Sequence, residues 1–249
     1  MALTLFWRCE GATLDGSHDY SAGDAVATAN GSTTLDAAAA KIGSNGILIN
    51  ASSERYSFDP ASIISTSVGS IGFWVRFVTS MPGAPHFYFY CRGTNSNDYL
   101  TIASVGTGGQ VELQLRNNVG GLLPLSTASG TVDANMAADQ WYFITASWDI
   151  ANDDRRIRVY NSSGTLIQHH EDTSTDLASY EPANFTTGGL QIGDTSGWGA
   201  TIVGHYDNIF IGSAYDDADT FAEKRDIASY ADYAGGSSNG AAVYYYSQL

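Results

Sequence analysis

Six side chains on three alternating stretches of the sequence have the chemistry to recognise a sugar. The rings of Tyr and Trp can stack on the C–H faces of a sugar, and Arg and Gln can form hydrogen bonds with its hydroxyls. Alternate residues of a β-strand point to the same side, so each pair should lie opposite its apolar neighbours. The expected carbohydrate-binding face consists of Trp74 and Arg76, Tyr88 and Tyr90, and Gln114 and Arg116.

The same alternation fits a surface without a binding role. Antiparallel sheets commonly turn one polar face to solvent, and such a face can also be covered by loops or by a partner. These two interpretations differ in what they predict for substitutions. If the face binds a ligand, a substitution there should weaken binding and leave the stability of the protein unchanged. If the face is covered, the substitution should lower the stability.

Motifs for common types of catalysis are missing. The chain has no Gly-x-Ser-x-Gly elbow, Walker loop, His-Glu-x-x-His pair or Cys/His zinc spacing. Its acidic pairs, Asp153-Asp154 and Asp216-Asp217, stand beside predicted turns. Asp is favoured there because its carboxylate accepts hydrogen bonds from its own backbone.

The elements that must position these residues are strands. Residues 140–150, QWYFITASWDI, alternate, and two further strands follow around a tight turn at residues 161–164, which predicts an antiparallel meander. Strands are expected at 45–51, 54–59, 69–79, 86–92, 97–105, 109–116, 120–125, 140–149, 155–161, 164–171, 187–193 and 202–212. This density predicts an all-β fold with two antiparallel sheets, a jelly-roll β-sandwich.

Helical structure is expected in two places only. Residues 12–42 read as an irregular excursion with a helical turn at 37–41. Thr220-Phe221-Ala222-Glu223 has the form of a capping box and predicts a short C-terminal helix that ends near Ser229.

Several segments resemble, in order, the laminin-G-like branch of the concanavalin A-like lectin/glucanase superfamily. The residues that carry the resemblance are FWRCEG at 6–11, GSNGILIN at 43–50, SIGFWVRF at 70–77, QWYFITASWDI at 140–150 and GHYDNIFIG at 204–212. The resemblance implies a jelly-roll sandwich. It does not choose between binding, assembly and catalysis, because this fold carries many functions.

The enzymes of this superfamily provide two patterns for comparison. Laminarinase-type glucanases use a Glu-x-Asp-x-x-Glu strand, and none of the six Glu residues begins one. Alginate-lyase-type members use a Gln-x-His strand, which Gln168 and His170 resemble, but the partnering Arg-x-Glu strand and the closing motif are missing. We therefore expect no catalysis, with a polysaccharide hydrolase or lyase as the weaker alternative.

The resemblance also implies a structural Ca²⁺ ion. Many members tie the N-terminal strand to the closing strand through such an ion, which takes six to eight oxygen ligands. Glu10 and Asp207 match the ligand positions, and Gly46 could offer its carbonyl. Cys9 departs from the pattern, because the family often has a second acidic residue there. In the alternative interpretation, Asp207 accepts hydrogen bonds from backbone amides near a bulge.

Composition narrows the range of partners. The 249 residues have a net charge of −15 with 11 Lys and Arg, which disfavours nucleic acid. No apolar run approaches the roughly 20 residues that a membrane span needs.

Cys9 and Cys91 form no disulfide framework and are expected to be buried. One domain is expected over residues 1–249, with a flexible tail at 235–249 whose aromatic end, VYYYSQL, should close a sheet edge or reach a neighbouring protomer in a homo-oligomer.

The N-terminal sequence MALTLFWRCEG has no signal-peptide pattern, although modules of the laminin-G type usually act outside cells. A virion component fits both facts, and so does a mature fragment that has lost its signal. The leading hypothesis is a non-catalytic module at a virion surface or in an extracellular setting. Its most concrete form is a phage capsid decoration protein or a tail-associated adhesin, with glycan or capsid proteins as partners. A free-standing carbohydrate-binding lectin is the alternative.

Overall fold

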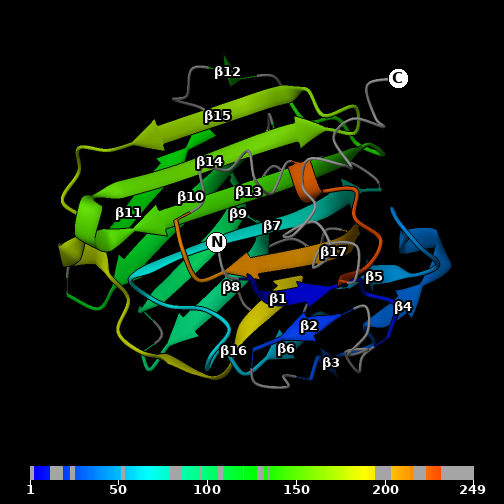
Figure 1. The fold of residues 1–249 in the computed structure, drawn as a ribbon, viewed down its shortest axis with the longest axis horizontal. Coiled ribbons are helices and arrows are strands. Elements are labelled where there is room, and N and C mark those ends of the chain that lie inside the picture. Colours follow the sequence, from blue (N-terminus) through cyan, green and yellow to red (C-terminus); the bar gives the residue numbers. More distant parts are fainter. Residues whose placement is uncertain are drawn as a thin grey trace.

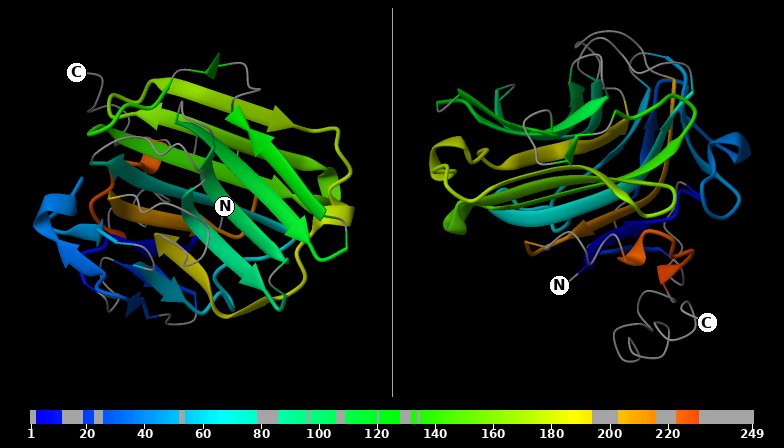
Figure 2. Two further views of the ribbon diagram at one scale, coloured as in Figure 1. Left: turned by 180° about the vertical axis from the view of Figure 1, so that it is seen from behind. Right: turned by 90° about the horizontal axis from the view of Figure 1, so that it is seen from above.

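The computed structural model describes most of the chain. The described residues are 3–11, 19–22, 26–51, 54–78, 86–95, 97–105, 109–119, 121–127, 132–133, 135–193, 203–215 and 223–230. They form two antiparallel sheets, one of ten strands and one of seven, that pack face to face (Figures 1 and 2). The predicted all-β sandwich is therefore confirmed.

The ten-stranded sheet contains the predicted meander. Its strand order is β12 (Val132–Asp133), β15 (Leu166–Asp172), β14 (Asp154–Asn161), β13 (Trp141–Asp149), β7 (Val68–Phe77), β17 (Gly204–Gly212), β1 (Leu3–Trp7) and β2 (Tyr20–Ser21). Strand β5 (Gly46–Ile49) joins it beside β17 and carries β4 (Thr34–Asp36). Strands β1 and β17, which are far apart in the sequence, are thus neighbours in one sheet, with β1 next to the edge strand β2 (Figure 1).

The seven-stranded sheet lies behind the first in Figure 1. Its strand order is β11 (Gly121–Ser126), β10 (Gln110–Asn117), β9 (Tyr99–Val105), β8 (His86–Gly93), β16 (Phe185–Gly193), β6 (Arg55–Phe58) and β3 (Thr28–Asn30). All of the predicted strands are present with boundaries shifted by a few residues. The short strands β2, β3, β4 and β12 were not predicted.

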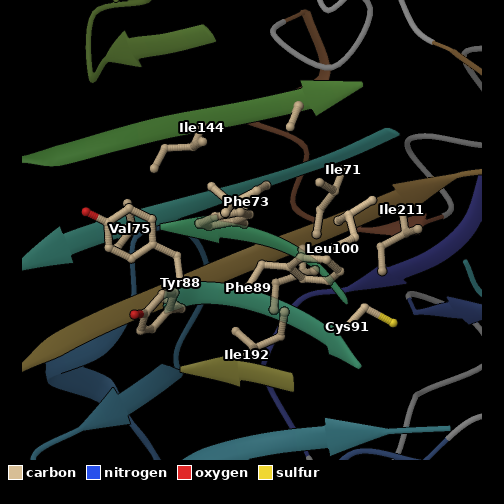
Figure 3. Packing of buried hydrophobic residues seen from close by; sticks show 14 of the residues in the cluster. Ile71, Phe73, Val75, Tyr88, Phe89, Cys91, Leu100, Ile144, Ile192 and Ile211 are labelled. Atoms are coloured by element: carbon tan, nitrogen blue, oxygen red, sulfur yellow. The ribbon is translucent and has the colours of Figure 1, made fainter. Parts of the chain in front are cut away.

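The core lies between the two sheets and is built by alternation. In β13, Tyr142, Ile144, Ala146 and Trp148 belong to the inner cluster, and their neighbours face outward. In β9, Leu100 and Ile102 do the same from the other sheet. Figure 3 shows such side chains from both sheets interlocking. Cys9 and Cys91 are buried free thiols, as expected.

A β-bulge in β8 breaks the alternation. Phe87 pairs with Ala103 and Phe89 pairs with Ile102, so Tyr88 is an extra residue without an opposite partner. A bulge of this kind shifts the in–out alternation by one residue, so that side chains before and after it no longer follow a single alternating pattern. As a result Tyr88 and Phe89 both belong to the inner cluster, while Phe87 does not.

A second apolar cluster covers the outer face of the ten-stranded sheet, the face turned away from the core. Its buried members are Leu3, Phe6, Trp74, Phe143, Tyr160 and Phe210. Residues 223–230, which we call the C-terminal strap, pack over it through Ile227 and Tyr230. The strap is the red-orange segment outside the sheet in the right panel of Figure 2.

The remaining expectations for local structure have mixed outcomes. Ala37–Ala39 form a 3₁₀ helix capped by Asp36, within the predicted helical turn. The predicted C-terminal helix starts at residues outside the described part, and its residues 225–229 are not helical. The tail at 235–249, with the proposed oligomer contact, also lies outside the described residues. Among the residues that are described, no helix has the length and apolar character needed to cross a membrane.

Candidate functional site

The structure divides five of the six predicted sugar-binding residues between opposite sides of the molecule and places the sixth, Tyr88, in the core. Trp74 and Arg76 lie on β7 of the ten-stranded sheet, whereas Tyr90, Gln114 and Arg116 lie on β8 and β10 of the seven-stranded sheet. The expectation of one continuous face is therefore wrong. Alternation in single strands gave no information about which sheet each strand joins.

Trp74 is a covered residue. Its side chain is fully buried, and its indole Nε1 donates a hydrogen bond of 2.6 Å to the Arg225 carbonyl of the strap. The Lys41 ammonium also packs over Trp74, 4.6 Å from the centroid of its ring. A ligand cannot reach this ring without displacing the strap.

Tyr88 is a core residue and not a surface residue. The bulge turns it inward, where it packs 5.2 Å from Phe77 between ring centroids, and Figure 3 shows it in the interior with Val75 and Phe89. Burial raises the pKa of its hydroxyl. The prediction that Tyr88 lies on a binding face is wrong, because strand alternation does not continue through a bulge.

The other predicted residues meet on the outer face of the seven-stranded sheet. Cross-strand pairing brings Tyr90, Thr101, Gln114 and Pro124 into one row, and Gln191 of β16 continues that row beside Tyr90. The next row contains Arg92, Tyr99, Arg116 and Leu122. We call this surface the tyrosine face, with Phe87, Tyr90, Arg92, Tyr99, Thr101, Glu112, Gln114, Arg116, Leu122, Pro124 and Gln191 as its members.

Aromatic side chains form a continuous strip on the tyrosine face. The ring centroids of Phe87 and Tyr90 are 5.6 Å apart, and those of Tyr90 and Tyr99 are 5.5 Å apart. These separations are normal for aromatic pairs in contact. Tyr90 stays half-buried, whereas Phe87 and Tyr99 are buried. Tyr90 is thus the ring that is open to a ligand.

Polar groups surround this strip. The Arg116 guanidinium carbon lies 5.7 Å from the Tyr99 ring centroid. Burial raises the pKa of the Glu112 carboxyl, against the lowering effects of a hydrogen bond from Gln114 and of the Arg155 charge. Rings with hydrogen-bonding groups at their edge are the combination that sugars require.

Sequence reasoning missed Tyr99 and Phe87 as members of this face. Tyr99 had an available signal, because Tyr99, Thr101 and Ala103 alternate with the core residues Leu100 and Ile102. Phe87 had none, because the bulge that turns it outward has no mark in the sequence.

Arg76 lies in a separate group on the ten-stranded sheet. Its Nη2 donates hydrogen bonds to the Ala38 carbonyl at 3.1 Å and to His205 Nδ1 at 2.8 Å. Its guanidinium carbon also lies 5.4 Å from the Trp141 ring centroid. Burial, and after it the nearby Arg76 charge, lower the pKa of His205 to about 4. The neutral imidazole therefore accepts from Arg76.

The expected calcium ligands hold a loop through its backbone. Asp207 Oδ2 accepts from Lys41 N at 2.7 Å and from Ile42 N at 2.8 Å, while its Oδ1 accepts from Asn208 N at 2.7 Å. Glu10 Oε1 accepts from Ser44 N at 2.7 Å. We call this arrangement the amide clamp. It lies at a bulge of β17, where Asn208 has a positive φ.

This geometry does not fit a calcium shell. Calcium needs six to eight oxygens directed at the ion, and here both Asp207 oxygens face N–H donors. Gly46 is explained by packing, since a Cβ there would lie 2.0 Å from the Ala39 carbonyl oxygen. Among the described residues, no group of three or more His, Cys, Asp or Glu side chains could hold a metal. The amide-bonded alternative for Asp207 is the arrangement present.

The residues of the lyase alternative serve structural roles. Gln168 is buried, accepts from the Thr127 hydroxyl at 2.8 Å and donates to the Gly109 carbonyl at 2.9 Å. His170 Nδ1 lies 2.6 Å from the Ser126 carbonyl oxygen. Both side chains thus connect β15 to the segments around β11 and do not lie on the tyrosine face.

Comparison with known proteins adds evidence on the fold. No family model matches the chain, and no curated protein does. The chain is similar in fold to botulinum neurotoxin binding domains. The serotype G binding domain superposes with a TM-score of 0.63 at 14% identity, over 88% of this chain and 50% of that one. For the serotype C1 and D binding domains the TM-score is 0.60, at 16% and 11% identity, over 90% of this chain.

The chain spans about half the length of these structures. At such low identity the likeness concerns the fold alone. The β-sandwich implied by the laminin-G-like resemblance is confirmed, and membership in that superfamily stays a prediction.

Proposed function

We propose that this protein is a non-catalytic binding module that recognises a glycan with the tyrosine face. The observation that carries the proposal is the contact of Tyr90 with Phe87 and Tyr99 in a strip edged by Gln114 and Arg116. The half-buried Tyr90 ring offers a flat apolar surface of the kind that sugar rings stack on. The buried rings beneath it hold its position.

Other observations support binding over catalysis. A retaining glycosidase needs two carboxyls about 5–5.5 Å apart, and Glu112 is the one carboxylate among the members of the tyrosine face. The similar structures are binding domains of botulinum neurotoxins, and one of them is in complex with rat synaptotagmin II. A likeness of this kind supports a role in recognition for the same fold.

The finer form of the proposal places the module at a virion surface, as a capsid decoration protein or a tail-associated adhesin. The acidic surface, with a net charge of −15, favours solubility in such an exposed setting. Genes for capsid, portal or tail proteins next to the gene for this chain would support it. Neighbouring genes for polysaccharide use would favour the free-standing lectin instead.

The test is a glycan array with two matched tyrosine variants. Tyr90→Ala should abolish retention, because it removes the ring on which the sugar stacks. It should lower the free energy of unfolding by only about 1 kcal/mol, as expected for a half-buried side chain. Tyr215→Ala is the control, because Tyr215 is also half-buried but lies against Arg156 of the ten-stranded sheet. Equal retention by both variants would contradict the proposal.

An enzymatic role has a direct assay. Incubation with a polysaccharide panel should release no reducing ends and no 4,5-unsaturated product. If such a product appears and His170→Ala abolishes it, the lyase alternative replaces the binding proposal.

A further inference from the structure

Two of the few cations of this chain share one cross-strand row of the tyrosine face. Arg92 of β8 pairs with Tyr99 of β9, and Tyr99 pairs with Arg116 of β10. Adjacent strands are about 4.8 Å apart, so the two arginines start about 10 Å from each other on either side of the Tyr99 ring. This separation leaves room for one anionic group between two long side chains.

Tyr99 acts as a positioning residue for Arg116. Its ring is 3% exposed, so it cannot stack on a sugar itself. The Arg116 guanidinium packs over that ring at 5.7 Å, a cation–π contact that restricts the guanidinium. The Arg116 side chain is half-buried. Arg92, on the other side of the ring, is exposed. Guanidinium groups bind carboxylates and sulfates through paired hydrogen bonds.

The overall charge of −15 does not oppose an anion at this position. At physiological ionic strength, charges more than about 8 Å apart are largely screened. Glu112, the acidic member of the face, lies four residues from Arg116 along β10, or about 13 Å. Burial also raises the pKa of this carboxyl. Asp98, next to Tyr99 in the sequence, is buried, and its carboxylate accepts a hydrogen bond from Asn118 N at 2.6 Å. The charged members of the Tyr99 row itself are the two arginines.

We infer that the ligand is an acidic sugar whose anionic group binds between Arg92 and Arg116 while its ring stacks on Tyr90. This inference rests on the proposed function and specifies its ligand class. A uronic acid carboxylate and a sulfate ester share the required chemistry. The face is suited to a chain of such sugars, because the Tyr90 row and the arginine row lie side by side.

The experiment is affinity electrophoresis of the full chain in gels that contain one polysaccharide each. The gels contain polygalacturonate, its neutral methyl ester, dextran sulfate, or neutral dextran. The variants are Arg92→Gln, Arg116→Gln and Tyr99→Leu. Arg158→Gln is the matched control, because Arg158 is half-buried on β14 of the other sheet. Thermal melts of all variants confirm that each one is folded.

The native chain should bind an acidic polymer at least tenfold more tightly than its neutral counterpart, and the preference should weaken as salt is raised. Arg92→Gln and Arg116→Gln should each reduce that binding about tenfold, the effect of one lost charge-assisted hydrogen bond. Arg158→Gln should leave it unchanged. Tyr99→Leu should weaken binding to the acidic polymer more than binding to the neutral one, because it affects both the Arg116 guanidinium and the Tyr90 ring. A purely structural role for the ring would weaken both to the same extent.

The result on the four polymers separates the possible outcomes. Binding to polygalacturonate identifies a carboxylate as the anionic group, and binding to dextran sulfate alone identifies a sulfate. Equal binding to acidic and neutral polymers, or full binding by Arg116→Gln, overturns the inference and leaves the proposed function standing. No retention on any polymer or on the glycan array overturns the proposed function, and the inference with it.

Discussion

The outer faces of the two sheets begin from the same sequence pattern and have different structural outcomes. On the ten-stranded sheet, the outward aromatic residues Trp74, Phe143 and Phe210 are fully buried beneath the strap and its neighbours. On the seven-stranded sheet, Tyr90 is half-buried and Arg92 is exposed. The difference shows that alternation identifies which side chains leave the core. It does not show whether a distant segment then covers them.

The covering segments are held by polar contacts as well as by apolar ones. Asn208 Nδ2 donates to the Ile227 carbonyl at 2.6 Å, and the Tyr20 and Tyr230 rings stack at 4.9 Å. The amide clamp holds a second covering segment, residues 41–45, against the same sheet. Specific contacts of this kind fix the cover in one position. We therefore assign a structural role to the covered face of the ten-stranded sheet, and the tyrosine face stays the proposed recognition surface.

The largest expected effect tests the covered face. Trp74→Ala should lower the free energy of unfolding by about 3–5 kcal/mol, the usual cost of removing a large buried aromatic side chain. Urea denaturation measures this loss, and glycan retention by the folded fraction should not change. A stable variant with reduced glycan retention would reverse the assignment of the two faces.

A smaller effect is expected for the pH dependence of stability, which should differ between the two sides of the seven-stranded sheet. On the inner side, burial lowers the pKa of His86 to about 4 from its usual 6.5. Below pH 6.5 His86 takes up a proton in the unfolded chain but stays neutral in the native state down to about pH 4. Protonation therefore favours the unfolded chain, and the stability of the native state falls as the pH falls. The stability of the native chain relative to His86→Gln should drop by about 3 kcal/mol between pH 7 and pH 4.

Glu112 on the outer side should give the opposite sign. Burial raises its pKa, so the native state binds the proton more readily than the unfolded chain does. The native chain should gain stability relative to Glu112→Gln as the pH falls toward 4.5. Chemical denaturation at several pH values measures both differences. A Glu112 difference that does not change with pH would mean that this carboxyl is solvated and that the tyrosine face is more open than described.

The smallest effect concerns the amide clamp. Asp207→Asn should cost about 2 kcal/mol, because the Asn amide group turns a donor toward backbone N–H groups that now have a carboxylate acceptor. Asp59→Asn is the control, since Asp59 is exposed and its carboxylate accepts a hydrogen bond from Ala61 N at 3.0 Å. Chelation by EDTA should leave the melting temperature unchanged.

The expected Ca²⁺ ion would give a different result. An ion at a hundredfold excess over its dissociation constant would stabilise the fold by about 2.7 kcal/mol, and EDTA would remove that stabilisation. A lower melting temperature in EDTA that added calcium restores would show that the clamp closes around an ion.

The fold could be predicted from the sequence because its information is local. The alternation of β13 and the tight turn after β14, where Asn161 accepts from Ser163 N at 3.0 Å, are both readable over a few residues. The position of Asp207 was also predictable as a choice between a cation and backbone amides. Sequence analysis identified Asp207 but could not decide whether its carboxylate binds a cation or backbone amides.

Two parts of the site could not be predicted, for different reasons. The inward turn of Tyr88 depends on one extra residue in β8, which shifts the phase without any distinctive residue type. The burial of Trp74 depends on Arg225, which is 151 positions away in the sequence. Pattern reading has no access to such a contact, because local periodicity carries no information about the distant partner.

The pairing of β1 with β17 has a consequence for how the chain is made. The Thr4 hydroxyl donates to the Ile211 carbonyl across 207 positions, so the first strand emerges from the ribosome long before its partner exists. At about 5–20 residues per second, that delay is roughly 10–40 s. During this time the apolar run LTLFW has no strand beside it on the β17 side and is open to aggregation. Nascent chains stalled before residue 204 should therefore bind chaperones, and release of the complete chain should end that binding.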